Sequence, residues 1–232
     1  MMLWKYEPGR RARPLVIGHR GAPLRHTENT IISYKTALEL GADAIEVDVQ
    51  LTADGHIVCC HDPDLERITG TRITIAENTL ADCRSAFPDL ATLEQVCAAF
   101  PKAGILIDTK IDTDDFADEL RRVCASTQAF GRIMVGAPSP TQAQRLRRRL
   151  DLPFCALFKA PVELSLYSEL SLSWMRLHPK EYRLETVQTL HAAGIGAILL
   201  ANADMARGGG TYPQLGRDRI GRGNWMRRLP CR

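Results

Sequence analysis

Two carboxylates separated by one residue, Glu46 and Asp48, lie in the apolar segment AIEVDV. Side chains alternate between the two faces of a strand, so both carboxylates project from the same face. Apolar residues flank the pair and predict a strand buried on both faces, where two unpaired carboxylates would cost a large desolvation energy. A bound cation is the better account, and Mg²⁺ or Ca²⁺ prefers oxygen ligands of this kind. Spacing alone also allows the alternative that the two carboxylates face outward from a solvated strand and bind no cation.

Other ionisable residues follow apolar runs in the same way. Asp108 and Lys110 end the run ILIDTK with the same spacing, offering a third oxygen ligand and a positive charge suited to a phosphate oxygen, or else a plain ion pair. His19 and His61 each come just after a strand-like run. Two imidazoles near a phosphate form an acid and base pair at neutral pH. A lone histidine is more often structural, so this hypothesis depends on several positions converging.

Strand-like apolar runs alternate with helical patterns along the chain. The strand-like runs are 15–18, 44–49, 57–60, 104–107, 133–135, 154–158, 174–177 and 197–200. The helical patterns are 29–40, 93–100, 114–127, 140–150 and 184–193. Seven or eight strands with intervening helices predict an α/β fold, a (β/α)8 TIM-like barrel, in a single domain spanning residues 1–232. Catalytic groups in such barrels lie at the carboxyl ends of strands, as the residues above do.

Two segments depart from the regular alternation. The first, about residues 62–93, follows the second strand region and is too long for a simple loop, so we expect a small insertion over the barrel mouth, with a strand-like piece at Arg72–Ile75. Its apolar residues predict a core of its own, the alternative being a lipid-accepting groove. These residues are Leu65, Ile68, Ile73, Ile75, Leu80 and Phe87.

The second segment, about residues 203–232, is an atypical C-terminal region with three consecutive glycines and no helical period. We therefore expect an atypical or degenerate eighth strand. Either Gly216–Ile220 is a vestigial strand, or the barrel is incompletely closed and exposes sheet edges.

Composition limits the possible partners and location. The net charge is only +3, and no aromatic residues interleave with the clustered arginines, so we expect no nucleic-acid partner. The seven cysteines are scattered, as expected of reduced thiols in a cytoplasmic protein. No apolar run approaches membrane-spanning length. The basic C-terminal residues leave surface binding to anionic lipid as an alternative, but without an amphipathic helix we expect no membrane association. The oligomeric state is not indicated.

The segment VIGHRGAPLRHTENTIISYKTALELGADAIEVDVQLTADGHIVCCHD closely resembles the opening of the glycerophosphodiester phosphodiesterase family. That family's pattern runs HRG, ENT, E-x-D, T-x-DG and HD in this order, and weaker similarity continues at Ala91–Val96, in ILIDTK and at His191–Ile195. The resemblance implies an acid and base pair at His19 and His61, and phosphate binding by Arg20. It also implies metal ligands at Glu46 and Asp48, supported by Glu28 and Asn29.

The resemblance further implies a metal-dependent hydrolase with Mg²⁺ or Ca²⁺ as cofactor and a small-molecule phosphodiester as substrate. Glycerophosphodiesters would yield glycerol 3-phosphate and an alcohol. The family usually has glutamate at the position of Asp108, in an E-x-K pattern that keeps Lys110. The related sphingomyelinase D-like phospholipases resemble this chain in having aspartate at that position. The alternatives are therefore phospholipase D-like specificity for lysophospholipids or sugar phosphodiesters, or a catalytically weak binding barrel.

Overall fold

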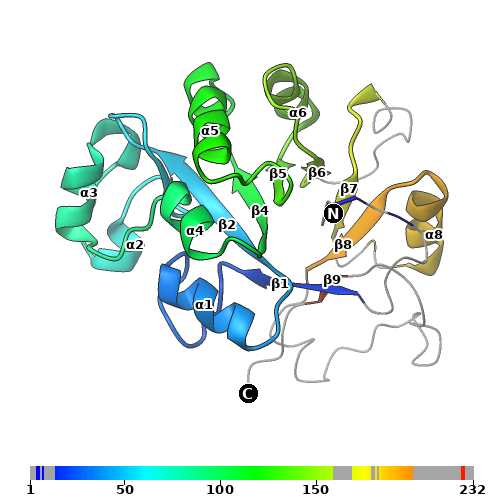
Figure 1. The fold of residues 1–232 in the computed structure, drawn as a ribbon, viewed down its shortest axis with the longest axis horizontal. Coiled ribbons are helices and arrows are strands. Elements are labelled where there is room, and N and C mark those ends of the chain that lie inside the picture. Colours follow the sequence, from blue (N-terminus) through cyan, green and yellow to red (C-terminus); the bar gives the residue numbers. More distant parts are fainter. Residues whose placement is uncertain are drawn as a thin grey trace.

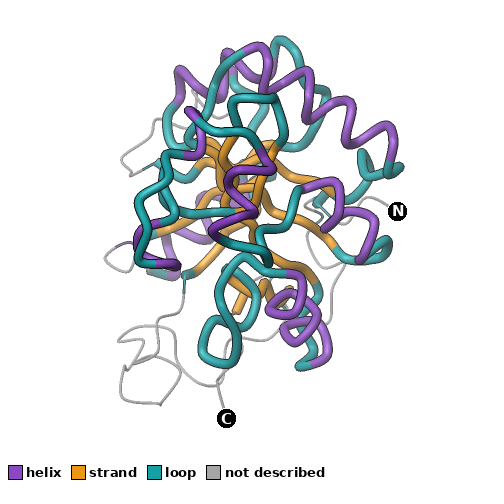
Figure 2. The backbone as a smooth tube through the Cα atoms, turned by 90° about the vertical axis from the view of Figure 1, so that its left-hand side faces the viewer, coloured by secondary structure: helices purple, strands orange, loops and turns teal. Residues whose placement is uncertain are grey.

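We describe a computed structural model of the 232-residue chain. The structure describes residues 4–5, 7, 14–158, 169–178, 181 and 183–200, and the backbone of 226–227. In this part of the chain no helix is both long and apolar enough to cross a membrane. The strands lie at the centre and the helices lie outside them (Figures 1 and 2).

A curled parallel sheet forms the centre, with its strands in the order β8-β7-β6-β5-β4-β2-β1-β9. These strands are β1 (Leu15–His19), β2 (Ala44–Leu51), β4 (Gly104–Thr109), β5 (Ile133–Ala137), β6 (Phe154–Ala156), β7 (Trp174–Leu177), β8 (Gly196–Leu199) and β9 (Met226–Arg227). All neighbours in this order pair in parallel, which confirms the predicted α/β barrel-type fold.

The last strand is atypical, as predicted. The two-residue β9 pairs with β1, and within the described residues no ladder joins β9 to β8, although these two strands lie near each other. The predicted vestigial strand at Gly216–Ile220 lies outside the described residues, and so do the side chains of the basic C-terminal region.

Helices cover the outer face of the sheet (Figure 1). They are α1 (Ile31–Glu39), α4 (Leu93–Ala99), α5 (Asp114–Ser126), α6 (Pro140–Arg147) and α8 (Leu184–Ala192). The hydroxyls of Thr30, Thr92, Thr113 and Ser139 cap the first four by accepting a hydrogen bond from the backbone N–H three residues later. The helices predicted from sequence are therefore present, with ends shifted by a few residues.

The run 57–60 does not join the parallel sheet, so its placement among the barrel strands was wrong. Strand β3 (Ile57–Cys59) pairs antiparallel with β2, and Cys59 lies opposite Val49. The connection 52–56 is too short for a parallel crossover and suits a hairpin. Because the chain turns back, His61 returns toward the level of Asp48 on β2.

The insertion contains α2 (Glu66–Thr69), the 3-10 helix η1 (Ile75–Glu77) and α3 (Leu80–Ala86), and lies beside the end of β2 (Figure 1). Its apolar residues form a separate core, as predicted. Buried in it are Val58, Cys60, Leu65, Ile75, Cys83, Phe87 and Leu90, with Ile68, Ile73 and Leu80 packed against them. The strand expected at Arg72–Ile75 was wrong, because only an isolated bridge between Asp64 and Thr74 forms before η1 begins.

A second core fills the inside of the curled sheet. It consists of Trp4, Leu15, Ile17, Ala44, Leu106, Met134, Cys155, Leu157, Trp174 and Ile198. Trp4 is held there by two hydrogen bonds: its indole Nε1 donates to the Arg132 carbonyl (2.7 Å), and its carbonyl accepts from Trp174 Nε1 (2.6 Å). Two residues further along their strands, on the same face, Ile17 gives way to His19, Ala44 to Glu46 and Leu106 to Asp108. The interior thus changes from apolar to ionisable toward the carboxyl ends of the strands.

Candidate active site

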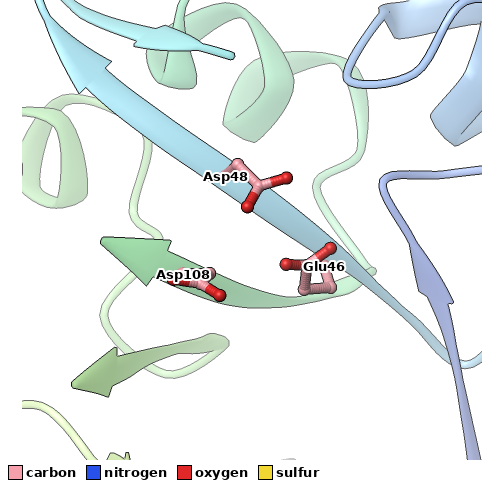
Figure 3. A group of neighbouring side chains, drawn as sticks. All are labelled: Glu46, Asp48 and Asp108. Atoms are coloured by element: carbon pink, nitrogen blue, oxygen red, sulfur yellow. The ribbon is translucent and has the colours of Figure 1, made fainter. Parts of the chain in front are cut away.

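Three carboxylates converge on the inner face of the sheet. Glu46 and Asp48 lie on β2, Asp108 lies on β4, and the strand register places Asp48 opposite Asp108. One oxygen atom from each of the three lies within 4.8 Å of the other two (Figure 3). This register gives the shorter aspartate side chain at position 108 enough reach to join the cluster.

The electrostatics of the cluster favour a cation. Burial raises the pKa of Glu46 well above its usual value, and the neighbouring Asp48 and Asp108 raise it further. Grouped oxygen ligands with repelling charges match the coordination that Mg²⁺ and Ca²⁺ require. The residues present therefore fit a divalent cation.

Basic side chains surround the carboxylates. Lys110 Nζ lies 3.0 Å from Asp108 Oδ1 and 3.4 Å from Asp48 Oδ1. Burial acts to lower the pKa of Lys110, but Asp108 and Asp48 outweigh it and the pKa is raised, so the ammonium stays charged. Arg20 Nε lies 3.0 Å from Asp48 Oδ2, although its N–H is not directed for a hydrogen bond.

The loop after β1 fixes the β2 carboxylates through two residues with left-handed backbones, Arg20 (φ 56°) and Asn29 (φ 57°). The Arg20 backbone N–H donates to Glu46 Oε2 (2.8 Å). The buried Asn29 amide donates to Asp48 Oδ2 (3.0 Å), and its Oδ1 accepts from the Tyr34 hydroxyl (2.8 Å). Asparagine tolerates this backbone region better than most residues. The HRG and ENT motifs therefore orient the two carboxylates.

His61 is oriented by the residue that follows it. Its Nδ1 lies 2.7 Å from Asp62 Oδ1, and the other Asp62 oxygen contacts Arg67 Nε closely. Burial acts to raise the pKa of Asp62, but His61 and Arg67 outweigh it and the pKa is lowered. An ionised carboxylate only accepts hydrogen bonds, so Nδ1 of His61 donates and Nε2 is left to exchange a proton.

Glu28 connects this group to the carboxylate cluster. Its Oε1 accepts from Arg20 Nη1 (3.0 Å) and from Arg67 Nη2 (2.7 Å). Burial acts to raise the pKa of Glu28, but the two guanidinium groups outweigh it and lower the pKa. Glu28 is thus a charged link between Arg20 and the insertion.

A cavity of about 40 Å³ adjoins the cluster and is lined by His19, Glu46 and Asp108, with Arg176 and apolar side chains completing its wall. Arg176, on β7, was not predicted from the sequence as a site residue. Its Nη1 lies 3.8 Å from Asp108 Oδ2, and its Nη2 donates to the Leu157 carbonyl (2.9 Å). A signal was present, because Arg176 stands two residues after the inward-facing Trp174 in an otherwise apolar run.

The residues predicted from sequence gather at this end of the sheet. Hydrogen bonds and ion pairs connect Arg20, Glu28, Asn29, Glu46, Asp48, Asp108 and Lys110, while His19 lines the adjoining cavity and His61 joins through Asp62 and Arg67. Their roles in ligand binding and proton transfer stay predictions.

The fold and the site together define a parallel α/β barrel-type protein with an acidic cluster at the carboxyl ends of its strands. The model of the Glycerophosphoryl diester phosphodiesterase family matches residues 19–198. The chain therefore belongs to this family, which confirms the predicted family resemblance.

Curated relatives match shorter stretches. The glycerophosphodiester phosphodiesterase of Caldanaerobacter subterraneus subsp. tengcongensis is 47% identical over 72 residues, which cover 31% of this chain and 30% of the relative. The glycerophosphodiester phosphodiesterase of Bacillus subtilis is 35% identical over 136 residues, covering 50% of this chain and 46% of the relative. The matches thus span less than half of either curated relative.

Solved structures share the fold over most of the chain. A putative glycerophosphoryl diester phosphodiesterase from Silicibacter pomeroyi superposes with a TM-score of 0.76 at 21% identity, covering 94% of this chain and 91% of that one. An Oleispira antarctica phosphodiesterase in complex with the product sn-glycerol-3-phosphate gives 0.71 at 18% identity, covering 92% and 93%. At these identities the likeness shows the fold.

Proposed function

We propose that this chain is a metal-dependent phosphodiesterase that hydrolyses glycerophosphodiesters to glycerol 3-phosphate and an alcohol. The observation that carries the proposal is the convergence of Glu46, Asp48 and Asp108 within 4.8 Å, with Lys110 and Arg20 beside them. Membership in the family supports it, as does the sn-glycerol-3-phosphate bound by the Oleispira antarctica relative.

Glu46, Asp48 and Asp108 would hold Mg²⁺ or Ca²⁺, which supplies Lewis-acid polarisation of a phosphate when bound. Arg20 and Lys110 place two fixed positive charges beside these carboxylates. There they bind phosphate oxygens and stabilise the negative charge that develops on them during displacement. Glu28 and Asn29 support this arrangement through Arg20 and Asp48.

The two histidines transfer protons. One deprotonates the nucleophile, and the other protonates the leaving alcohol. His61 holds its Nδ1 proton against Asp62, so Nε2 is the atom that gives or takes a proton. His19 lines the cavity beside the carboxylates and is the second group. Each histidine contributes roughly 10² to 10⁴ in rate as a general acid or base.

A lysophospholipid is the competing substrate, because the chain is also 28% identical over 115 residues to the human lysophospholipase D GDPD1, covering 42% of this chain. The insertion does not favour it, since its apolar residues pack in their own core. A catalytically weak binding barrel is the other alternative, and it need not lose its function in chelator.

A panel of diesters separates these alternatives. Glycerophosphocholine, glycerophosphoethanolamine and lysophosphatidylcholine are incubated with wild type, His19→Ala and the control His56→Ala, in Mg²⁺, in Ca²⁺ and in chelator. His56 lies in the connection between β2 and β3, with its Nε2 3.8 Å from Asp54 Oδ2. We expect metal-dependent release of glycerol 3-phosphate by wild type and His56→Ala only. Choline release from lysophosphatidylcholine alone would favour the competing substrate, and no turnover by folded protein would favour the binding barrel.

We also propose that the chain is a single domain over residues 1–232 and acts in the cytoplasm. The six cysteines among the described residues are free and buried, which suits a reducing compartment. Secretion of the full-length protein from its native host into an oxidising compartment, detected by cell fractionation, would contradict the location.

A further inference from the structure

Arg67, on α2 of the insertion, is shared between carboxylates from two separate loops. Its Nη2 lies 2.7 Å from Glu28 Oε1 in the loop between β1 and α1, and its Nε contacts Asp62 Oδ2 after β3. The side chain is 48% exposed. Exposed ion pairs contribute little to folding stability. The geometry of this contact therefore matters more for what it orients than for the stability of the fold.

Each of these carboxylates has a second partner in the candidate active site. Asp62 uses its other oxygen to hold His61 Nδ1 at 2.7 Å. Glu28 uses the same oxygen, Oε1, to hold Arg20 Nη1 at 3.0 Å. The two groups that would transfer a proton and bind phosphate are thus joined through one guanidinium.

Neither joined group is held by tight packing and aligned hydrogen bonds all round. The His61 side chain is 35% exposed, so packing constrains its ring on only part of its surface. Arg20 Nε has no aligned hydrogen bond, although it lies near Asp48. A guanidinium is planar, and its N–H donors have fixed directions, so binding two carboxylates at once also fixes their relative position.

We propose that Arg67 is a positioning residue, which orients the ring of His61 through Asp62 and the guanidinium of Arg20 through Glu28. The inference rests on the proposed phosphodiesterase function, and it assigns the insertion a role in aligning the site. A displacement of about 1 Å is enough to cost a catalytic group on the order of 10²-fold in rate.

Kinetics test the proposal by comparing Arg67→Ala in the wild-type and His61→Ala backgrounds. We expect Arg67→Ala to lower kcat/KM by about 10- to 100-fold in the wild type. Its effect in the His61→Ala background should be several-fold smaller, because the His61 arm is already absent there. Arg67→Lys should recover only a small part of the loss, since an ammonium cannot bridge both carboxylates in a fixed plane.

Arg84→Ala is the matched control. Arg84 also lies in the insertion, where its Nη2 donates to Gln95 Oε1 (2.6 Å) and its Nε to the Leu90 carbonyl (3.2 Å). Removing it should loosen the insertion and lower kcat/KM by less than about twofold in either background. Equal losses from Arg67→Ala in both backgrounds, or a loss from Arg84→Ala as large as that from Arg67→Ala, would overturn the proposal.

A spectroscopic measurement separates this proposal from the proposed activity. In protein labelled with ¹⁵N-histidine, NMR should show neutral His61 with its proton on Nδ1 in wild type and in Arg84→Ala. In Arg67→Ala we expect a mixture of both tautomers. An unchanged tautomer in Arg67→Ala overturns the positioning role. If the His61 tautomer changes as expected in Arg67→Ala but the wild type hydrolyses no diester, the positioning role stands and the phosphodiesterase function is refuted.

Discussion

Replacing Glu46 by glutamine should make the metal-free protein more stable while removing its response to metal. Glutamine keeps the shape of the side chain and removes one charge from the buried cluster. Two like charges within 4.8 Å of each other repel by at least about 3–4 kcal/mol at an effective dielectric constant of 20. Arg20 and Lys110 offset much of this, so we expect a net gain of about 1–2 kcal/mol, or about 2–8 °C in Tm.

The metal response should change in the opposite sense. A cation at 100 times its Kd stabilises the folded wild type by about 2.7 kcal/mol, which corresponds to about 5–10 °C in Tm. Glu46→Gln lacks one of the three ligands, so its Tm should rise by less than about 2 °C at the same concentration. Differential scanning fluorimetry in chelator and in increasing Mg²⁺ or Ca²⁺ measures both effects.

The pH dependence gives a further check on the same variant. The folded-state pKa of Glu46 is raised above its ordinary value of 4.5, so its contribution to stability is present below pH 4.5 and is lost as the pH rises through the raised value. The advantage of Glu46→Gln in chelator should therefore grow as the pH rises from 4.5 upward.

The control for all three effects is Glu39→Gln, at the end of α1, where the carboxylate is exposed and 3.8 Å from Lys35. It should leave the Tm and the metal response unchanged. A Glu46→Gln protein that is less stable than wild type in chelator and keeps the full metal shift would refute the reasoning.

Three other variants test separate parts of the structure. Gly196→Ala should destabilise the fold by about 1–3 kcal/mol in urea unfolding, because its Cβ would lie 2.3 Å from the Trp174 ring. Asn29→Ala should cost about 1–3 kcal/mol in the same measurement and lower activity, because it leaves the buried Tyr34 hydroxyl without its acceptor. Arg176→Met should tighten Mg²⁺ binding about fivefold by calorimetry, since a cation 3.8 Å from the Asp108 carboxylate is removed and charges at about 4 Å interact by ~1 kcal/mol in a solvated setting. Wild-type values for any of these variants would contradict the corresponding contact.

Residue types and spacing were enough to predict the acidic cluster. The apolar neighbours of Glu46 and Asp48 indicate a buried strand, and period two places both carboxylates on one face. The approach of Asp108 depends on the register of β4 against β2, which the sequence does not encode locally. Arg176 lies two residues after the inward-facing Trp174, on the same face of its strand. Looking for ionisable residues with this spacing in every apolar run would have found it.

Strand direction and long-range contacts were harder to predict. The apolar run 57–60 has the same composition whether it is parallel or antiparallel, and only the short connection before it indicates the hairpin. The run at Arg72–Ile75 has strand-like residues, but among the residues that the structure describes it pairs only through the isolated bridge from Thr74 to Asp64. The contact of Arg67 with Glu28 has no local signal, because the two residues lie 39 apart in sequence.

The most direct test of the central claim is the release of glycerol 3-phosphate from glycerophosphocholine by metal-depleted wild-type protein, before and after Mg²⁺ or Ca²⁺ is restored, with Glu46→Gln alongside. We predict that restoring the cation restores release by the wild type, while Glu46→Gln stays at least 10²-fold slower at the same concentration. Equal release in chelator and in metal, or equal rates for the two proteins, would contradict a metal-dependent phosphodiesterase built on Glu46, Asp48 and Asp108.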